Sequence, residues 1–469
     1  GGTLMAKTRP DYQTGAPTGL IWVICWSWML CGIVQTLPSS FFPSEAASFG
    51  TPDLAIGIIF SAYQTTMIIS TPFFVSLTSK LGPWTLIRWS LIGLVICNAI
   101  MGTSYLIRRC LSSFIAITVV LRGISGISSC GIMIGGNTYI MKVSPSKELG
   151  YNLAVFETAG SVGLCIGPML GSWLYAMGGF VWAFFGISLL IIPGVVLPSL
   201  VEMMASKSEE NASTVNSSSK ELSAEQSLSK SKNGNEIETG DFGGMGNGLE
   251  ILCAWTFAKC PYLALLCLDL LFAGMAWTFI DPILERHLSD SHNLTQFHTG
   301  LFFGLMSLTY IFATGLVGMA AKHSHNHRAF TYGVMYIGMA VLGGALLMLN
   351  INQVSTKVVA LGLVGIGQAL TYLPIVLALT QTLKDRCKGD VSAYVAGVSQ
   401  FFVSVGFALG PFIGSQLTSR FSFEATCTFI GLSILLSSGC TVVAMIMKQG
   451  WNSKQDEEER YPRLLKPAS

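Results

Sequence analysis

Four ionisable side chains, Arg122, Glu157, Asp269 and Asp281, lie within long apolar stretches of the 469-residue sequence. A charged side chain near the centre of a bilayer costs at least about 2.5 to 3.5 kcal/mol, so each is a candidate for function. Carboxylates in such places can bind protons or cations, and a neighbouring guanidinium favours their charged form. We therefore predict that Glu157, Asp281 and Asp269 bind protons and that Arg122 tunes Glu157.

The expected depths of Glu157 and Arg122 suggest that they pair. Glu157 lies about 10 Å inside one end of its apolar stretch, and Arg122 lies about 15 Å from the opposite face. In a hydrocarbon core about 30 Å thick these depths differ by only about 5 Å. A permanent structural ion pair is the alternative to a proton and cation site.

Asp281 directly precedes Pro282, and a proline in a membrane helix frees backbone groups and opens the helix toward a cavity. We expect Asp281 to bind a substrate ammonium group. The alternative is a carboxylate that caps the end of the helix. Asp269 lies twelve residues earlier, about 120° around the helix, so the two acids cannot both face one cavity squarely.

The composition predicts the secondary structure in which these four residues lie. The chain is 51% hydrophobic and 11% charged, whereas soluble chains carry about 25% charged residues. We predict an all-α membrane protein with twelve transmembrane helices in two pseudo-symmetric six-helix halves. The apolar stretches lie at 19–40, 54–79, 85–107, 112–136, 150–176, 180–202, 261–286, 299–321, 329–349, 357–382, 391–418 and 424–447.

The charges divide the chain into five segments. Most of the 27 Lys and Arg residues fall on the side that carries both chain ends, which predicts that this side is cytoplasmic. The net charge of +2 is therefore explained by membrane insertion and does not indicate nucleic acid. A Ser-, Asn- and Lys-rich stretch predicts a disordered linker between the halves. The expected segments are a tail (1–18), a first half (19–202), the linker (203–258), a second half (259–447) and a second tail (448–469).

An internal repeat supports the two halves, because 151–172 aligns with 394–415 at a constant offset. Both copies carry glycines four residues apart, which allow helix backbones to approach closely in lipid. Both also contain a proline that removes one backbone hydrogen bond. The expected packing and gating residues are Gly163, Gly167, Pro168, Gly171, Gly406, Gly410, Pro411 and Gly414. At this repeat, Glu157 aligns with Gln400.

The repeated motif resembles that of a known family. "GSVGLCIGPMLGS" and "LRGISG" resemble the helix 5 and helix 4 motifs of major facilitator antiporters. "FFPSEA", "IGIIF", "FETAGSVGLCIGP" and "FIDPIL" are similar to the vesicular amine transporter family, and specifically to its polyamine-transporting branch. In the monoamine branch an acid also precedes the helix 7 proline, which implies that Asp281 contacts the substrate amine.

The departures from the monoamine members argue against a monoamine substrate. Those members carry acids in helices 1, 10 and 11, where this sequence has Gln35, Ala369 and Gln400. Tyr63, Gln64, Tyr372, Gln400 and Gln35 are the expected polar lining of a substrate cavity. The tyrosine rings could contact a cation, although each residue alone is more often a packing residue.

We therefore expect a proton-coupled antiporter that moves organic cations, especially polyamines, into acidic vesicles by alternating access. Its partners are the substrate, protons and the bilayer. No cofactor, metal or enzymatic motif is expected, since the twelve cysteines lack metal-ligand spacing. The tail "QDEEERYPRLLKP" suggests sorting adaptors. The alternatives are a facilitator without proton coupling, a receptor on the same fold, and a plasma-membrane location.

Overall fold

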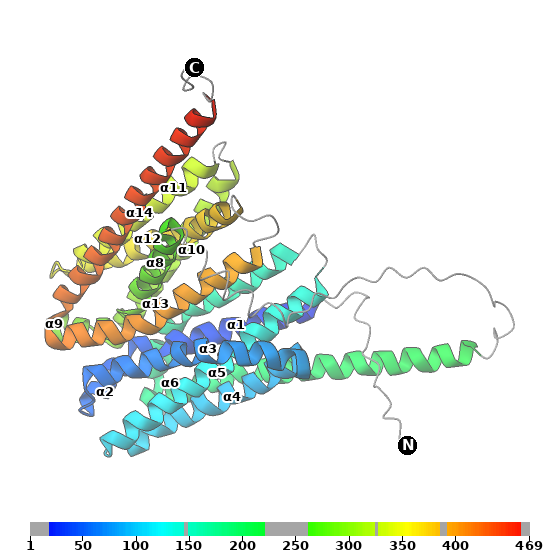
Figure 1. Cartoon of the computed structure of the whole chain (residues 1–469). Coiled ribbons are helices and arrows are strands. Elements are labelled where there is room, and N and C mark those ends of the chain that lie inside the picture. Colours follow the sequence, from blue (N-terminus) through cyan, green and yellow to red (C-terminus); the bar gives the residue numbers. More distant parts are fainter. Residues whose placement is uncertain (1–17, 145–148, 221–260, 324–326, 385–391, 461–469) are drawn as a thin grey trace, which may run out of the picture.

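The computed structural model describes residues 18–144, 149–220, 261–323, 327–384 and 392–460, and every regular element among them is helical (Figure 1). The first half contains α1 (Thr18–Thr36), η1 (Leu37–Ser40), α2 (Phe42–Ser48), α3 (Asp53–Leu81), α4 (Pro83–Thr103), η2 (Ser104–Ile107), α5 (Leu111–Val143) and α6 (Leu149–Lys220). The second half contains α8 (Pro261–Thr278), α9 (Leu284–His292), α10 (Gln296–His323), α11 (His327–Met348), α12 (Val354–Lys384), α13 (Ser392–Arg420) and α14 (Phe423–Arg460).

Within the described residues, eleven stretches are long and apolar enough to cross a membrane, and one of them accounts for two crossings. The stretch Val155–Val196 in α6 has 42 residues, or about 63 Å at 1.5 Å per residue, which is about twice the hydrocarbon thickness. Its backbone leaves the helical region at Gly178 and at Gly179, where φ is 71°. Only glycine adopts this conformation readily. The chain therefore turns back at Gly179, which gives the twelve predicted crossings.

Several helices end at places that differ from the sequence prediction, including α8, α6 and α14. The helix expected over 261–286 ends at Thr278, so Asp281 lies in the turn between α8 and α9 and not inside a helix. The physical reason is Pro282, which has no backbone N–H to continue the ladder. α6 continues as helix to Lys220 and α14 to Arg460, within segments expected as linker and tail. The rest of those segments lies outside the described residues.

The repeated glycines bring equivalent helix pairs together in both halves. A methyl group on Gly163 would lie 2.0 Å from the backbone oxygen of Met29 in α1. Likewise, a methyl group on Gly406 would lie 2.2 Å from the backbone oxygen of Leu271 in α8. Since real carbon atoms do not approach this closely, α6 and α1, and also α13 and α8, can pack as they do only with glycine at these positions.

The two halves meet through α3 with α13 and through α6 with α10. A methyl group on Gly57 of α3 would lie 2.7 Å from the Pro411 oxygen, and one on Gly300 of α10 would lie 2.1 Å from the Ser172 hydroxyl. These contacts lie near the end of the bundle that carries α2 and α9. We call it the luminal end, because the charge distribution predicts that it faces away from the cytoplasm. In Figure 1 the ribbons of the two halves diverge from this end toward the chain termini.

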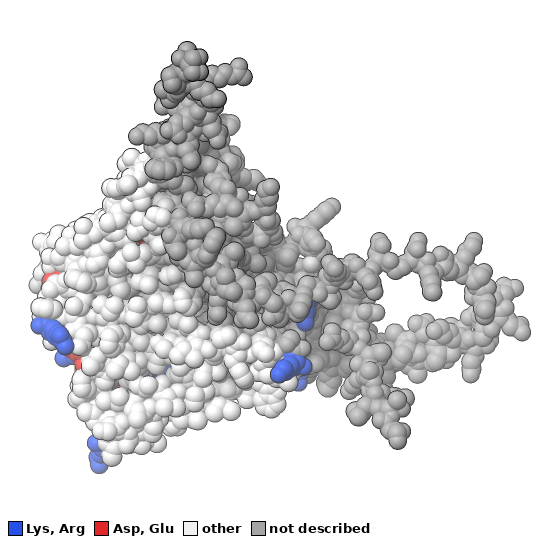
Figure 2. All heavy atoms as spheres, in the orientation of Figure 1, with Lys and Arg blue, Asp and Glu red and all other residues white. Residues whose placement is uncertain are grey.

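The outer surface agrees with a membrane environment. Figure 2 shows one face that is almost free of charge between its ends, with Lys, Arg and acidic side chains near the edges. Large apolar side chains such as Trp22, Ile69 and Phe312 are more than 60% exposed. Exposed apolar side chains in such a band are suited to contact lipid.

Candidate functional site

Arg122 of α5 is buried inside the first half and held by the end of α1. Its side chain is 4% exposed. Its two terminal nitrogens donate hydrogen bonds to the backbone oxygens of Val34, at 3.0 Å, and Gln35, at 2.9 Å. Its guanidinium also lies 4.9 Å from the centre of the Tyr63 ring, within the range of a cation–π contact. Val34, Gln35 and Tyr63 therefore fix the direction of the guanidinium group.

Asp281 from the second half is the acid that faces Arg122. It is 8% exposed and interacts electrostatically with the guanidinium. The expected pairing of Arg122 with Glu157 is not found in this conformation, in which the guanidinium hydrogen-bonds to two backbone oxygens of α1 and interacts electrostatically with Asp281. The predicted depths of Arg122 and Glu157 could not show which groups the guanidinium would contact. This electrostatic interaction acts between the two halves of the molecule.

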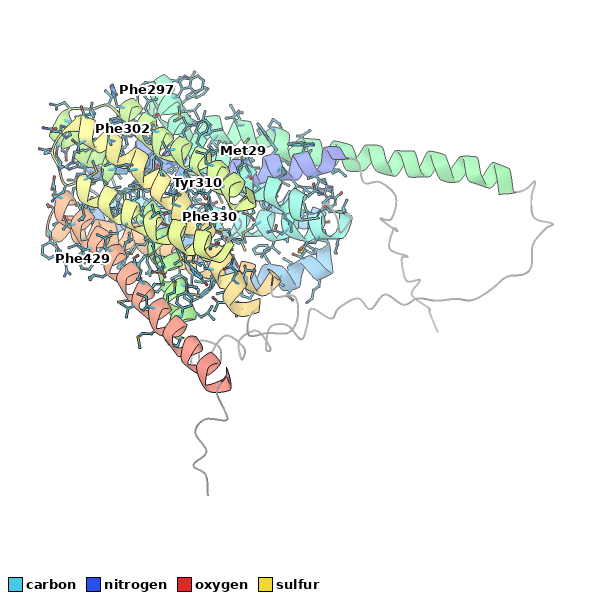
Figure 3. The ribbon with its side chains drawn as sticks, turned by 90° about the horizontal axis from the view of Figure 1, so that it is seen from above. Met29, Phe297, Phe302, Tyr310, Phe330 and Phe429 are labelled. Atoms are coloured by element: carbon cyan, nitrogen blue, oxygen red, sulfur yellow. The ribbon has the colours of Figure 1, made fainter. Side chains whose placement is uncertain are left out.

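Glu157 of α6 interacts with tyrosines of the second half. Its side chain is exposed and interacts electrostatically with Tyr310 of α10 and Tyr372 of α12. Tyr310 packs edge-on against Trp277 of α8, with 5.2 Å between ring centres. In Figure 3, Tyr310 lies toward the middle of the helix bundle, whereas Phe429 lies at its edge. Glu157 therefore interacts with two tyrosines of the other half, and Trp277 packs on one of them.

Tyr310 and Trp277 were missed by the sequence prediction. Tyr310 carries the same signal as Tyr63 and Tyr372, a polar aromatic residue inside an apolar stretch, and could have been included on that ground. Trp277 has no such signal, because tryptophan near a membrane helix end is usually an interfacial anchor.

Asp269 lies away from both acids at the interface. It is completely buried within the second half, where its carboxylate accepts hydrogen bonds from the hydroxyls of Ser437 and, at 2.8 Å, Thr441. Both partners belong to α14. The structure therefore places Asp269 between α8 and α14, on a different side of the helix from the interface with the first half.

The other expected lining residues have mixed surroundings. Tyr63 is 1% exposed and donates a hydrogen bond to Ser129 at 2.6 Å, and Gln64 is buried with no partner for its side-chain oxygen. Tyr372, Gln400 and Gln35 are half-buried. Gln400 donates to the Ser404 hydroxyl at 3.3 Å. In this conformation Tyr63 supports Arg122 from inside the first half.

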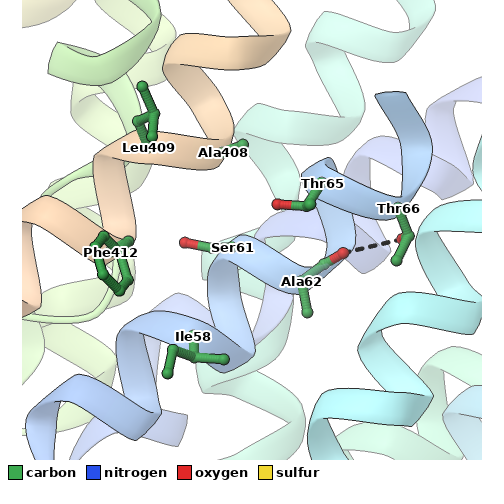
Figure 4. A pocket seen from close by; sticks show the side chains of 8 residues that line it. All are labelled: Ile58, Ser61, Ala62, Thr65, Thr66, Ala408, Leu409 and Phe412. Carbon is green, nitrogen blue, oxygen red and sulfur yellow. Dashed lines mark hydrogen bonds between the residues drawn. The ribbon is translucent and has the colours of Figure 1, made fainter. Parts of the chain in front are cut away.

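A separate cavity of about 410 Å³ lies in the seam between α3 and α13 (Figure 4). Apolar and hydroxyl side chains line it: Ile58, Ser61, Ala62, Thr65, Thr66, Ala408, Leu409 and Phe412. None of the predicted acids reaches this cavity, so it offers no partner for an ammonium group. Within the described part of the chain, no group of three or more His, Cys, Asp or Glu could hold a metal ion.

Almost the whole chain matches a known family. The model of the Major Facilitator Superfamily matches residues 24–268 and 266–468. The rat synaptic vesicular amine transporter is 20% identical over 402 residues, which cover 85% of this chain and 68% of that protein. The mouse protein named MFS-type transporter SLC18B1 is 21% identical over 453 residues, which cover 92% of this chain and 88% of that protein.

Solved structures show the same fold. A bacterial homologue of the human lysosomal transporter Spinster, crystallised in an inward-facing and occupied conformation, superposes with a TM-score of 0.63 and 13% identity. The match covers 93% of this chain and 96% of the bacterial one. At this identity, the similarity concerns the fold alone.

Proposed function

Because the chain belongs to the Major Facilitator Superfamily, we propose that it exchanges organic cations, polyamines first among them, for protons across a vesicle membrane. The chain is a multi-pass membrane transporter related to vesicular amine transporters and is not an enzyme. The proposal adds to this an organic cation as the substrate and a coupling of its transport to protons.

The observation that carries the proposal is the exposed carboxylate of Glu157 and its electrostatic interaction with Tyr310 and Tyr372. A carboxylate attracts an ammonium group, and aromatic ring faces add about 0.5 to 2 kcal/mol for a cation held against them. The two tyrosines come from the half opposite to Glu157. A cation bound here would therefore contact both halves and respond to their relative movement.

Asp281 provides a second acid with a different neighbour. In this conformation the guanidinium of Arg122 partly neutralises it. An amine at Asp281 would have to compete with Arg122, whereas a proton on Asp281 would remove the attraction for both cations. Binding of a proton and binding of an amine therefore oppose each other, and this opposition is reciprocal at equilibrium.

Transport follows if the halves rock about a site near the middle of the membrane, as in other transporters built from repeats. Protons that enter from an acidic lumen neutralise Glu157 or Asp281 and release the amine on that side. The expected locations are acidic vesicles, with adaptor binding at a tail whose last residues lie outside those described.

The test is uptake of labelled spermidine into proteoliposomes with an acidic interior, with and without a protonophore. We expect gradient-dependent uptake by the wild type and its loss in Glu157→Gln and in Asp281→Asn. Asp290→Asn is the matched control, because Asp290 is 69% exposed outside the predicted spans. Uptake that ignores the gradient would contradict proton coupling, and no uptake by the wild type would contradict the polyamine substrate.

A further inference from the structure

The luminal end of the bundle is closed by a polar contact between α2 and α9, the short helices that follow the first crossing of each half. The backbone N–H of Ser44 in α2 donates a hydrogen bond to the Glu285 carboxylate of α9 at 2.7 Å. Glu285 is 1% exposed. A buried acid thus ties the second half directly to the backbone of the first.

Two neighbouring contacts hold these helices in place. The Tyr175 hydroxyl of α6 donates to the Glu45 carboxylate at 2.5 Å, which fixes α2 against the first half. Arg286 of α9 forms an ion pair with Asp53 of α3, across the two halves. Because the side chains of this pair are 43% and 30% exposed, solvent weakens their attraction. The buried Glu285 contact is therefore the more sensitive element of the closure.

The charges around Glu285 are mainly acidic. Glu45 of α2 and Asp290 of its own helix interact with it electrostatically, and so does the Tyr175 hydroxyl of α6. The one cation beside it in sequence, Arg286, is engaged by Asp53 and, at 3.6 Å, by Asp290. A charged Glu285 would thus be buried next to like charges. A neutral Glu285 avoids this repulsion and can still accept the hydrogen bond from Ser44.

We propose that Glu285 is a luminal proton latch, which holds α2 against α9 when it is protonated and lets the luminal end open when it is charged. The inference rests on the proposed orientation and on alternating access, and is independent of the substrate. It concerns a residue of α9 that is not among the acids proposed to bind the amine.

The direction of the pH effect follows from the closed state. α9 lies beyond the membrane span Pro261–Thr278 of the structure. Burial raises the pKa of Glu285 to about 7; the hydrogen bonds from Ser44 oppose this rise, and Asp290 and Glu45 add to it. A solvent-exposed glutamic acid titrates near 4.3. The closed state therefore gains stability that is fully present below about pH 4.3 and is lost as the luminal pH rises through about 7. An acidic lumen favours closing of the luminal end after release of a substrate.

Hydrogen exchange in lipid nanodiscs, without substrate, tests the latch. We expect amide exchange in segments 42–48 and 284–292, corrected for its intrinsic pH dependence, to rise several-fold in the wild type between pH 5.5 and 8. Glu285→Gln keeps a neutral acceptor for Ser44, so its exchange should stay low at both pH values. Ser291→Ala, an exposed position on the same helix, should follow the wild type.

A further variant tests the Glu285 latch without any measurement of transport. Glu285→Ala removes the acceptor and should raise exchange in both segments even at pH 5.5, while the melting temperature reports whether each variant is folded. The proposal is wrong if the wild type shows no pH dependence, or if folded Glu285→Gln either keeps that dependence or exchanges fast at both pH values. Because no substrate is present, these results do not depend on whether the chain transports amines.

Discussion

The two halves of the molecule share their packing contacts but not their charged residues. The Thr36 hydroxyl donates to the Leu164 oxygen at 3.0 Å in the first half, and the Thr278 hydroxyl donates to the Phe407 oxygen at 3.3 Å in the second. Thr66 reaches Gly123 at 2.7 Å, and Thr309 reaches Gly362 at 2.9 Å. These pairs recur at a nearly constant spacing along the chain, so the scaffold is duplicated in detail.

The charged groups differ between the halves. The first half carries Arg122 and Glu157, whereas Gln400 stands opposite Glu157 in the repeat. The second half contributes Asp281 and the Tyr310 ring. Since Gln400 occupies the equivalent position with a neutral side chain, packing of this helix does not require an acid there. The comparison supports our proposal that the duplicated residues build the scaffold and that the unmatched residues carry the chemistry of transport.

The largest effect is expected where the halves are alike. Gly163→Ala and Gly406→Ala should each strongly reduce the yield of folded protein, because the new methyl group would overlap a backbone oxygen of the neighbouring helix. Size-exclusion chromatography of detergent extracts measures this. Gly439→Ala is the control, since nothing lies within 4 Å of its added methyl group. Similar yields for all three variants would contradict the packing role.

The next prediction concerns Glu157 and Gln400, which align in the repeat but differ in charge. Glu157→Gln should reduce gradient-driven uptake of spermidine at least tenfold while leaving folding intact, because Gln400 already shows that the amide fits this kind of position. The double variant Glu157→Gln with Gln400→Glu should remain inactive, since only the first half's position faces Tyr310 and Tyr372. Restored uptake in the double variant would show that the halves are equivalent in chemistry as well.

A smaller effect is expected for the aromatic partner. Tyr310→Ala should raise the KM for an organic cation about five- to tenfold, which corresponds to a lost cation–π contact of about 1 to 1.4 kcal/mol. Tyr310→Phe keeps the ring and should stay within about twofold of the wild type. Equal losses in both variants would point to the hydroxyl group instead of the ring face.

The smallest effect on transport is expected for Asp269. Asp269→Asn should leave the pH dependence of uptake unchanged, because the carboxylate faces Ser437 and Thr441 of α14. It should lower stability by about 1 to 3 kcal/mol, since a buried hydrogen-bonding group is altered. Uptake across a pH series measures the first effect and thermal unfolding the second. A shifted pH dependence of uptake in Asp269→Asn would indicate that Asp269 takes part in proton coupling.

The helices were predictable from sequence because a membrane crossing demands about 20 apolar residues, a signal that is hard to miss. The short helices α2 and α9, of seven and nine residues, lacked such a signal. Contacts such as Ser44 with Glu285 join residues far apart in the chain, and no local pattern encodes them. Arg122 shows most clearly what could not be predicted from the sequence. Its depth was predictable, but its direction depends on two carbonyl groups of α1.

The most direct test of proton-for-amine exchange is the internal pH of proteoliposomes that contain a pH-sensitive dye, with spermidine added outside and no gradient imposed. We expect the interior to become alkaline with the wild type, as protons leave in exchange for the amine, and to remain unchanged with Glu157→Gln. Uptake of labelled spermidine by the wild type without any change of internal pH would contradict the account.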